Sequence, residues 1–172
     1  MTTQIRKTAL ITGASSGIGL AYALELAKQN FRLILLSLDK TRLLDQQHLF
    51  DKEHTQFLSK DLRNPNAVLE ISKEVPAPDL IVANAGVTLH GRAGSFDVDE
   101  KANLYYLLCG GVIDLIESYL PEMRERRSGR IVIISSIGAL TPMPKSSIYS
   151  SAKAGIFAYG RSIHQELKKG QH

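Results

Sequence analysis

Short apolar runs alternate with amphipathic segments along the chain. Residues 8–12 form an apolar run that a glycine cluster closes, and residues 18–30 then carry apolar side chains at helical spacing. A second continuous apolar run covers residues 32–38, as expected of a strand buried on both faces. Residues 40–49 are predicted to be helical, with Asp39 as the N-cap. The pattern predicts strand, tight turn, helix, strand and helix.

The same alternation continues through the rest of the sequence. Further strands are predicted at residues 56–58, 79–83 and 131–134, and further helices from Pro65, from about 97 to 127 and from about 147 to 169. Strands that alternate with helices imply right-handed crossovers and a parallel sheet covered on both faces. We therefore expect one doubly wound, Rossmann-like α/β domain over residues 1–172.

The last predicted strand is expected to form an open edge of this sheet. The chain ends at His172, directly after the final predicted helix, so the backbone groups of strand 131–134 would stay unpaired on one side. Either something covers this edge, or residues follow position 172.

Composition and charge exclude several functional classes. With 44% apolar and 22% charged residues the chain has the composition of a folded domain. Its net charge is +4, but basic residues cluster only at 124–130, so nucleic-acid binding is not expected. No apolar run approaches the roughly 20 residues that span a bilayer, and the first one is too short for a signal peptide. A single cysteine, Cys109, excludes an internal disulfide and points to the cytoplasm.

A glycine-rich turn follows the first predicted strand and reads Gly13-Ala14-Ser15-Ser16-Gly17-Ile18-Gly19. Unpaired N–H groups and the positive end of a helix dipole can hold a pyrophosphate there, and glycines allow the backbone to approach it. The spacing differs from the Gly-x-Gly-x-x-Gly fingerprint, and no lysine follows as in a Walker A loop. The turn predicts a dinucleotide site; the alternative is a plain turn.

Further motifs give the chain a specific resemblance. In chain order they are Asp61-Leu62 after the third predicted strand, Asn84-Ala85-Gly86 after the fourth, Ser136 after the fifth, and Tyr149-x-x-x-Lys153. Together with the glycine turn they resemble the short-chain dehydrogenase/reductase family over nearly the whole chain. The resemblance implies an NAD(P)-dependent oxidoreductase acting on a small-molecule alcohol or carbonyl. It also implies that Asp61, Leu62, Asn84, Ala85 and Gly86 contact the cofactor together with the glycine turn.

The predicted catalytic residues have a physical rationale. Tyr149 and Lys153 are four residues apart on one predicted helix, so their side chains share a face. A neighbouring ammonium favours the phenolate and lowers the tyrosine pKa towards the working range. Ser136 can hydrogen-bond the substrate oxygen, and the resemblance adds that Lys153 bonds the nicotinamide ribose. Two alternatives remain: an amphipathic helix with a snorkelling lysine, and the acyl-enzyme pattern Ser-x-x-Lys at residues 150–153, whose partner motifs are absent.

The sequence departs from the family at the fourth catalytic position. Many members carry an asparagine in the pattern Asn-x-x-Gly, and Gly111 and Pro121 align best if this position is Leu108. Asn103 lies five residues upstream and is expected to be a solvated helix residue, so either Asn103 or no residue fills the role. The usual C-terminal strands and substrate-covering segment are also missing. A non-catalytic dinucleotide-binding or regulatory protein is therefore the alternative function.

The choice of cofactor depends on the end of the second predicted strand. Members that use NAD place an aspartate there, and those that use NADP often have a small residue followed by arginine. This chain has Ser37-Leu38, and Leu38 is expected to contact the cofactor. Lys40 or Arg42 can substitute as a partner of the 2′-phosphate. We expect NADP or NAD, with NADP favoured.

The two long C-terminal helices predict an assembly. They carry more apolar side chains than one sheet can cover, namely Leu104, Leu107, Leu108, Val112, Leu115, Ile116, Tyr119, Ile156, Phe157, Tyr159 and Ile163. In the family these helices commonly pair across a two-fold axis, which implies a homodimer or homotetramer. The alternative is that a neighbouring segment of the same chain covers these residues.

Overall fold

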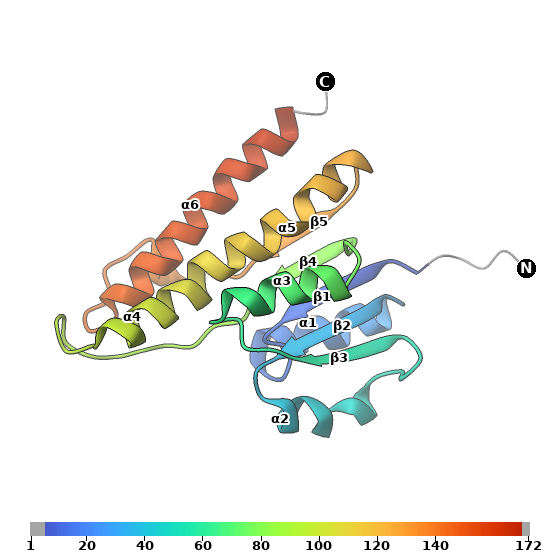
Figure 1. Cartoon of the computed structure of the whole chain (residues 1–172), viewed down its shortest axis with the longest axis horizontal. Coiled ribbons are helices and arrows are strands. Elements are labelled where there is room, and N and C mark those ends of the chain that lie inside the picture. Colours follow the sequence, from blue (N-terminus) through green and yellow to red (C-terminus); the bar gives the residue numbers. More distant parts are fainter. Residues whose placement is uncertain (1–5, 170–172) are drawn as a thin grey trace, which may run out of the picture.

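Parallel strands form the centre of the computed structural model, which describes residues 6–169. The strands are β1 (Thr8–Thr12), β2 (Arg32–Ser37), β3 (Thr55–Ser59), β4 (Leu80–Ala83) and β5 (Arg130–Ile133). Their spatial order is β3-β2-β1-β4-β5 (Figure 1). The chain adds β2 and β3 on one side of β1 and then adds β4 and β5 on its other side, so a topological switch point lies between β1 and β4. Ligands of doubly wound sheets bind at such a switch point. The predicted fold class is confirmed, whereas the predictions for residues 1–5 and for the region after His172 lie outside the described residues.

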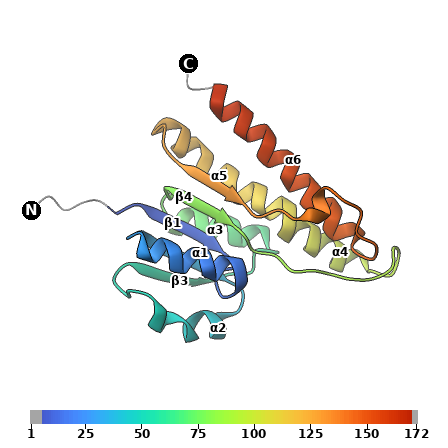
Figure 2. The ribbon, with the colours of Figure 1, turned by 180° about the vertical axis from the view of Figure 1, so that it is seen from behind.

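Helices cover both faces of the sheet (Figures 1 and 2). The first group is α1 (Gly17–Lys28) and α2 (Lys40–Asp45), and the second is α3 (Pro65–Glu74), α4 (Val98–Tyr105), α5 (Gly111–Glu125) and α6 (Ser147–Lys169). Two separate apolar clusters result, one between the sheet and α1–α2 and one between the sheet and the second group. None of the described helices is both long enough and apolar enough to cross a bilayer.

Capping residues set several helix starts as predicted. The Asp39 carboxylate accepts a hydrogen bond from the backbone N–H of Arg42 at 2.9 Å, and α3 opens on Pro65. Two predicted helices are interrupted instead of continuous. The helix predicted at 40–49 ends at Asp45 and continues as a 3-10 turn over Gln47–Leu49.

The second interruption lies in the helix predicted from 97 to 127. It consists of α4, a π-helical turn over Tyr106–Gly110, and α5. Two successive glycines, Gly110 and Gly111, are poor helix formers and weaken the regular hydrogen-bond ladder here. A Cβ on Gly111 would lie 3.0 Å from the Leu62 carbonyl oxygen, so the helix also passes close to the loop after β3. Such π-turns occur frequently at functional sites.

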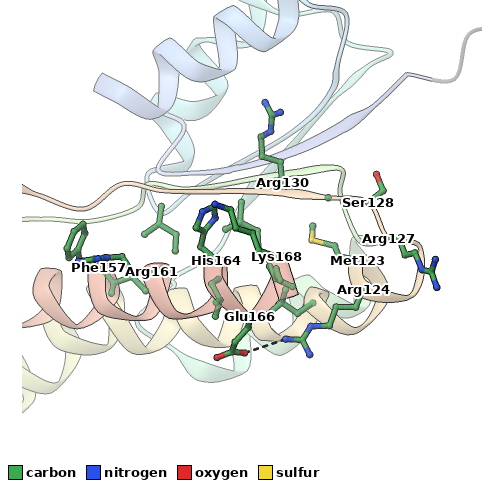
Figure 3. Close-up of a pocket in the computed structure, with 18 of the residues that line it drawn as sticks. Met123, Arg124, Arg127, Ser128, Arg130, Phe157, Arg161, His164, Glu166 and Lys168 are labelled. Atoms are coloured by element: carbon green, nitrogen blue, oxygen red, sulfur yellow. Dashed lines mark ion pairs between the residues drawn. The ribbon is translucent and has the colours of Figure 1, made fainter. Parts of the chain in front are cut away.

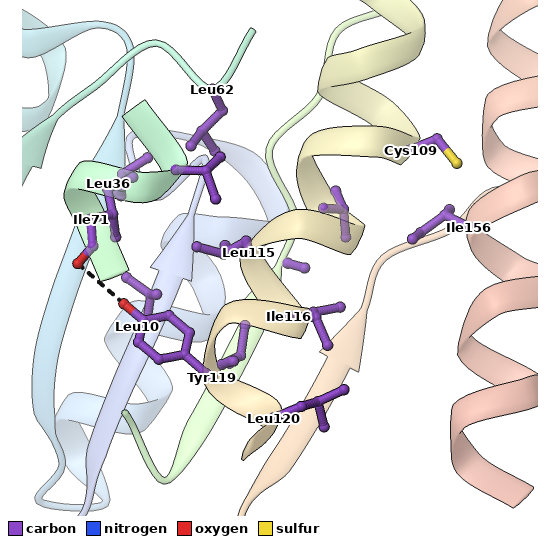
Figure 4. Packing of buried hydrophobic residues seen from close by; sticks show 14 of the residues in the cluster. Leu10, Leu36, Leu62, Ile71, Cys109, Leu115, Ile116, Tyr119, Leu120 and Ile156 are labelled. Atoms are coloured by element: carbon purple, nitrogen blue, oxygen red, sulfur yellow. Dashed lines mark hydrogen bonds between the residues drawn. The ribbon is translucent and has the colours of Figure 1, made fainter. Parts of the chain in front are cut away.

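Helix α5 forms the centre of the larger apolar cluster (Figure 4). Leu115 and Ile116 are at most 1% exposed, and Tyr119 reaches across to α3, where its hydroxyl donates to the Ile71 carbonyl at 3.3 Å. Burial raises the pKa of Tyr119 to about 12, because the phenolate would lose its hydration. These contacts fix α5 to both the sheet and α3.

The structure corrects the reasoning behind the predicted assembly. Most of the apolar residues on which that prediction rests are buried within the chain, between α4–α5, α6 and the sheet: Leu104, Leu108, Val112, Leu115, Ile116, Tyr119, Ile156 and Ile163. Phe157 is 36% exposed, and Leu107 and Tyr159 are half-buried. The other helices of the same chain thus cover most of this surface. A dimer stays a prediction that this apolar pattern does not require.

Candidate active site

The glycine turn joins β1 to α1 with no room for side chains at its tightest points. Gly13 has a φ of +65°, and a Cβ on it would lie 2.9 Å from the Cα of Ala85. A Cβ on Gly19 would overlap the Gly13 carbonyl oxygen. The first turn of α1 therefore packs directly against the loop, and its N–H groups point to the carboxyl edge of the sheet. This bare backbone cradle fits the pyrophosphate of a dinucleotide.

Thr12 and Asn84 tie this cradle to β4. The Thr12 hydroxyl accepts hydrogen bonds from the backbone N–H groups of Asn84 and Ala85, each at 2.9 Å. The Asn84 amide nitrogen donates to the carbonyls of Thr12 and Gly13 at 3.1 and 3.2 Å. The predicted Asn-Ala-Gly motif thus lies beside the glycine turn, where its first residue fixes the loop conformation. Gly86 follows as an exposed residue.

The serines of the glycine turn have different environments. Ser15 is buried, and its hydroxyl lies 2.7 Å from the hydroxyl of Ser37 at the end of β2. Ser16 is exposed, as are its neighbours Gly17 and Ile18. Leu38 is 57% exposed directly after β2. The exposed residues are the ones that a bound nucleotide can reach, whereas Ser15 joins the turn to β2.

The acidic motif after β3 carries an ion pair. Both oxygens of Asp61 accept from the Arg63 guanidinium, from Nε at 2.9 and 3.1 Å and from Nη2 at 2.7 Å. The Arg63 hydrogen bonds hold the pKa of Asp61 below its usual value. Leu62 is buried, so its side chain anchors this loop while the ion pair stays at the surface.

Tyr149 and Lys153 lie on one face of α6, as the spacing predicts. The Lys153 ammonium nitrogen is 6.0 Å from the centre of the Tyr149 ring and donates to the Ile134 carbonyl at 2.8 Å. Lys153 is only 6% exposed, and this burial lowers its pKa. The Ser135 hydroxyl donates to the Lys153 carbonyl at 3.1 Å, which adds a second tie between α6 and the end of β5.

Ser136 lies three residues beyond β5, at the start of a short 3-10 turn over Ile137–Ala139. Its hydroxyl accepts a hydrogen bond from the N–H of Gly138 at 3.1 Å. Ile137 and Leu140 behind it are 74% and 71% exposed, so large apolar side chains flank the serine at the open side of the site. This arrangement suits a polar group surrounded by apolar substituents.

The position next to Lys153 is occupied by Leu108. A Cβ built on Gly86 would lie 2.8 Å from Leu108 Cδ2 and 3.9 Å from the Lys153 nitrogen, so the three residues converge. Leu108 belongs to the π-helical turn and is 1% exposed. Asn103 is an exposed residue of α4, one turn or more away, as expected. Hence Leu108, and not Asn103, is the residue of this helical segment that lies near Lys153.

One contact at the site was not anticipated from the sequence. The buried Ser146 hydroxyl lies 2.8 Å from Nδ1 of His90, and the N–H of Gly91 donates to the Lys145 carbonyl at 2.9 Å. These bonds join the loop after β4 to the residues that precede α6. A serine just before a predicted helix suggests a cap, but no local signal indicates a partner 56 positions away.

A large groove lies away from these residues. It has a volume of about 1440 Å³ and runs between α6 and the outer edge of β5 (Figure 3). Arg130 and Ile134 direct their N–H groups towards β4, to Asp79 and Ala83, so Ile131 and Ile133 direct theirs to the open edge. Among residues 6–169 β5 is thus an edge strand, as predicted. The groove follows this unpaired edge and not the carboxyl ends of the strands.

The fold and the site together define a dinucleotide-binding protein of the doubly wound class that carries a tyrosine–lysine pair beside the cradle. The chain belongs to the short-chain dehydrogenase family: the family model described as "short chain dehydrogenase" matches residues 7–171. Proteins of this family bind NAD(P).

Relatives and solved structures agree with this assignment. The chain is 30% identical to the ketoacyl reductase HetN of Nostoc sp. over 97% of its own length and 60% of that protein. It is 32% identical to a fatty acyl-CoA reductase of Acinetobacter baylyi, of which it covers 58%. A short-chain dehydrogenase from Sphingobium yanoikuyae, solved with NADPH, superimposes with a TM-score of 0.89 at 28% identity, covering 95% of this chain and 67% of that one. The chain thus spans about three fifths of those two relatives.

Proposed function

We propose that the protein is the nucleotide-binding and catalytic part of an NAD(P)-dependent oxidoreductase that interconverts a small carbonyl compound and its alcohol. The observation that carries this proposal is the buried Lys153 ammonium beside the Tyr149 ring, at the same sheet edge as the glycine cradle. A lysine is rarely buried without a function or a partner. The membership in the short-chain dehydrogenase family supports the same activity.

Each residue has a separate role in the proposed reaction. Ser136 orients the substrate by a hydrogen bond to its oxygen, and Tyr149 gives that oxygen a proton in reduction or removes it in oxidation. Lys153 stabilises the phenolate that remains on Tyr149, and its bond to the Ile134 carbonyl holds it in place. The bound nicotinamide supplies or accepts the hydride at the carbon atom. Ile137 and Leu140, which are largely exposed, offer apolar contacts to the substrate.

The test uses the substitution of the proposed acid–base. Tyr149→Phe removes the hydroxyl but keeps the ring, so NADPH-dependent reduction of a panel of ketones should fall by about 100-fold or more. Cofactor affinity, followed by NADPH fluorescence, should change by less than about threefold, because the glycine cradle is intact. Turnover equal to that of the wild type would remove Tyr149 from the mechanism.

For the cofactor we propose NADP in preference to NAD, held by Lys40 or Arg42. The last residue of β2 is Ser37, which is buried and contacts Ser15. Because this residue is not an aspartate, it offers no carboxylate to the ribose hydroxyls. Lys40 and Arg42 are exposed at the start of α2, directly after β2. Calorimetry should show tighter binding of NADPH than of NADH, with a preference that shrinks at high salt. Equal affinities at low salt would contradict this proposal.

A second candidate is a protein that binds the dinucleotide without turning over a substrate. Leu108 favours it, because a leucine at this position near Lys153 cannot assist proton transfer as an asparagine could. Replacing the leucine with asparagine separates the two candidates. If Leu108→Asn raises turnover from zero while cofactor affinity stays constant, the natural chain is the non-catalytic form.

We also propose that the open edge of β5 is covered in the working enzyme, since Ile131 and Ile133 present unpaired backbone groups to the groove. A dimer that forms through α5 and α6 is a separate prediction. Sedimentation at several concentrations tests the dimer. Hydrogen exchange at the amides of Ile131 and Ile133 tests whether the edge of β5 is covered, and rapid exchange in the active form would contradict a covered edge.

A further inference from the structure

The loop that follows β4 reaches the end of the molecule where α6 begins (Figure 2). The cradle motif Asn84–Gly86 opens this loop, and α6 carries Tyr149 and Lys153. The nucleotide side and the acid–base side of the site are thus also joined outside the sheet. The joining contacts are the His90–Ser146 side-chain bond and the backbone bond from Gly91 to Lys145.

Ser146 stands at the start of the catalytic helix. Its carbonyl accepts the first helical hydrogen bond of α6, from the N–H of Ser150 at 2.8 Å. Its side chain is 2% exposed, so the hydroxyl must find a partner inside the protein. Nδ1 of His90, at 2.8 Å, is that partner. A bond at this residue therefore sets where the first turn of α6 begins.

Tyr149 lies three residues after Ser146, within that first turn. The direction of a helical side chain follows from the position of its turn, so a shift of the helix start displaces the phenol. Lys153 is held one turn further on by the Ile134 carbonyl and does not fix the start of the helix by itself. Displacements of about 1 Å at a reacting group can lower a rate about 100-fold.

We propose that His90 is a positioning residue, which aligns Tyr149 with the bound nucleotide by holding Ser146. This inference rests on the proposed function of Tyr149. His90 itself needs no contact with substrate or cofactor for this role. The serine hydroxyl can donate or accept, so the bond forms with either neutral tautomer of the imidazole and also with the imidazolium.

The test uses two amides of different length. The side-chain amide of asparagine occupies the place of Nδ1, whereas that of glutamine occupies the place of Nε2. His90→Asn should keep turnover within about threefold, whereas His90→Gln and His90→Ala should lower kcat by about tenfold or more with KM for the cofactor changed less than about twofold. Ser146→Ala should match His90→Ala, and the double variant should be no worse than either. Equal rates for the asparagine and glutamine variants, or additive losses in the double variant, would overturn the proposal.

A measurement without turnover separates this inference from the proposed function. The amides of Gly91 and Ser150 should exchange hydrogen faster in His90→Ala and His90→Gln than in the wild type and in His90→Asn, since their bonds depend on the tie. Unchanged exchange in His90→Ala would show that the tie does not hold the helix start. If Tyr149→Phe keeps full activity the proposed function fails, and the exchange result still decides the structural part.

Discussion

Two regions of the sheet hold their functional residues in different ways. In the glycine-turn half, residues 8–83, the inner strands β1, β2 and β4 are almost wholly buried, and Thr12 receives two backbone hydrogen bonds from the loop after β4. At the catalytic edge, residues 130–169, β5 is half-buried and open on one side, and Lys153 is fixed by one bond of its side chain. The difference suggests that the packed core sets the geometry of the first region, whereas in the second region polar contacts add to the apolar packing of α6.

The comparison predicts which property a mutation in each region changes. A change in the glycine-turn half should alter stability and cofactor affinity together, because the same packed elements produce both. A change at the catalytic edge should alter turnover with little loss of stability.

The largest expected effect comes from matched isoleucines on a central and an edge strand. Ile11 in β1 is 0% exposed, whereas Ile133 in β5 is half-buried next to the open groove. Ile11→Ala should lower the free energy of unfolding by about 3–4 kcal/mol, since it leaves a cavity between packed layers. Ile133→Ala should cost about 1 kcal/mol. Urea denaturation of both variants measures the difference, and equal losses would show that the edge is as well packed as the centre.

A smaller effect on stability is expected when the hydroxyl of Thr12 is removed. Thr12→Val keeps the shape of the side chain but leaves the N–H groups of Asn84 and Ala85 without their acceptor. Stability should fall by about 2 kcal/mol, and NADPH should bind more weakly because the loop loosens. Thr12→Ser is the control, which keeps the hydroxyl. A loss of stability without any loss of affinity would break the proposed link between core and cradle.

The sequence predicts the glycine-turn half better than the catalytic edge, for physical reasons. Glycine spacing and the position of Asn84 after a strand are local signals, and the structure brings them together as expected. The assignment of Leu108 to the family's asparagine position comes from the resemblance to the family, through Gly111 and Pro121. The tie between His90 and Ser146 crosses 56 positions and depends on the path of a loop, which no periodicity encodes.

The apolar residues on the two long helices show a second limit of sequence patterns. Counting apolar residues on α5 and α6 suggests a second buried face, and the structure shows that the helices bury much of it against each other and the sheet. Periodicity identifies which residues are buried but not what buries them. Tyr119, one of these apolar residues, lies in the core with its hydroxyl bonded to α3.

The smallest predicted effect concerns the surface of the glycine-turn half, at the ion pair of Asp61 and Arg63. The guanidinium holds the pKa of the Asp61 carboxyl below its ordinary value, so the pair contributes stability that is present above the unfolded pKa of about 4 and is lost as the pH falls through the folded pKa. Because both side chains are partly exposed, this contribution near neutral pH should be about 0.5 kcal/mol. Arg63→Ala should therefore be slightly less stable than the wild type near neutral pH and equal to it in strong acid. Thermal unfolding across this pH range, with Arg63→Lys as a control that keeps the charge but not the bidentate geometry, measures the effect. A difference that stays constant with pH would show that Arg63 acts through packing and not through the charge of Asp61.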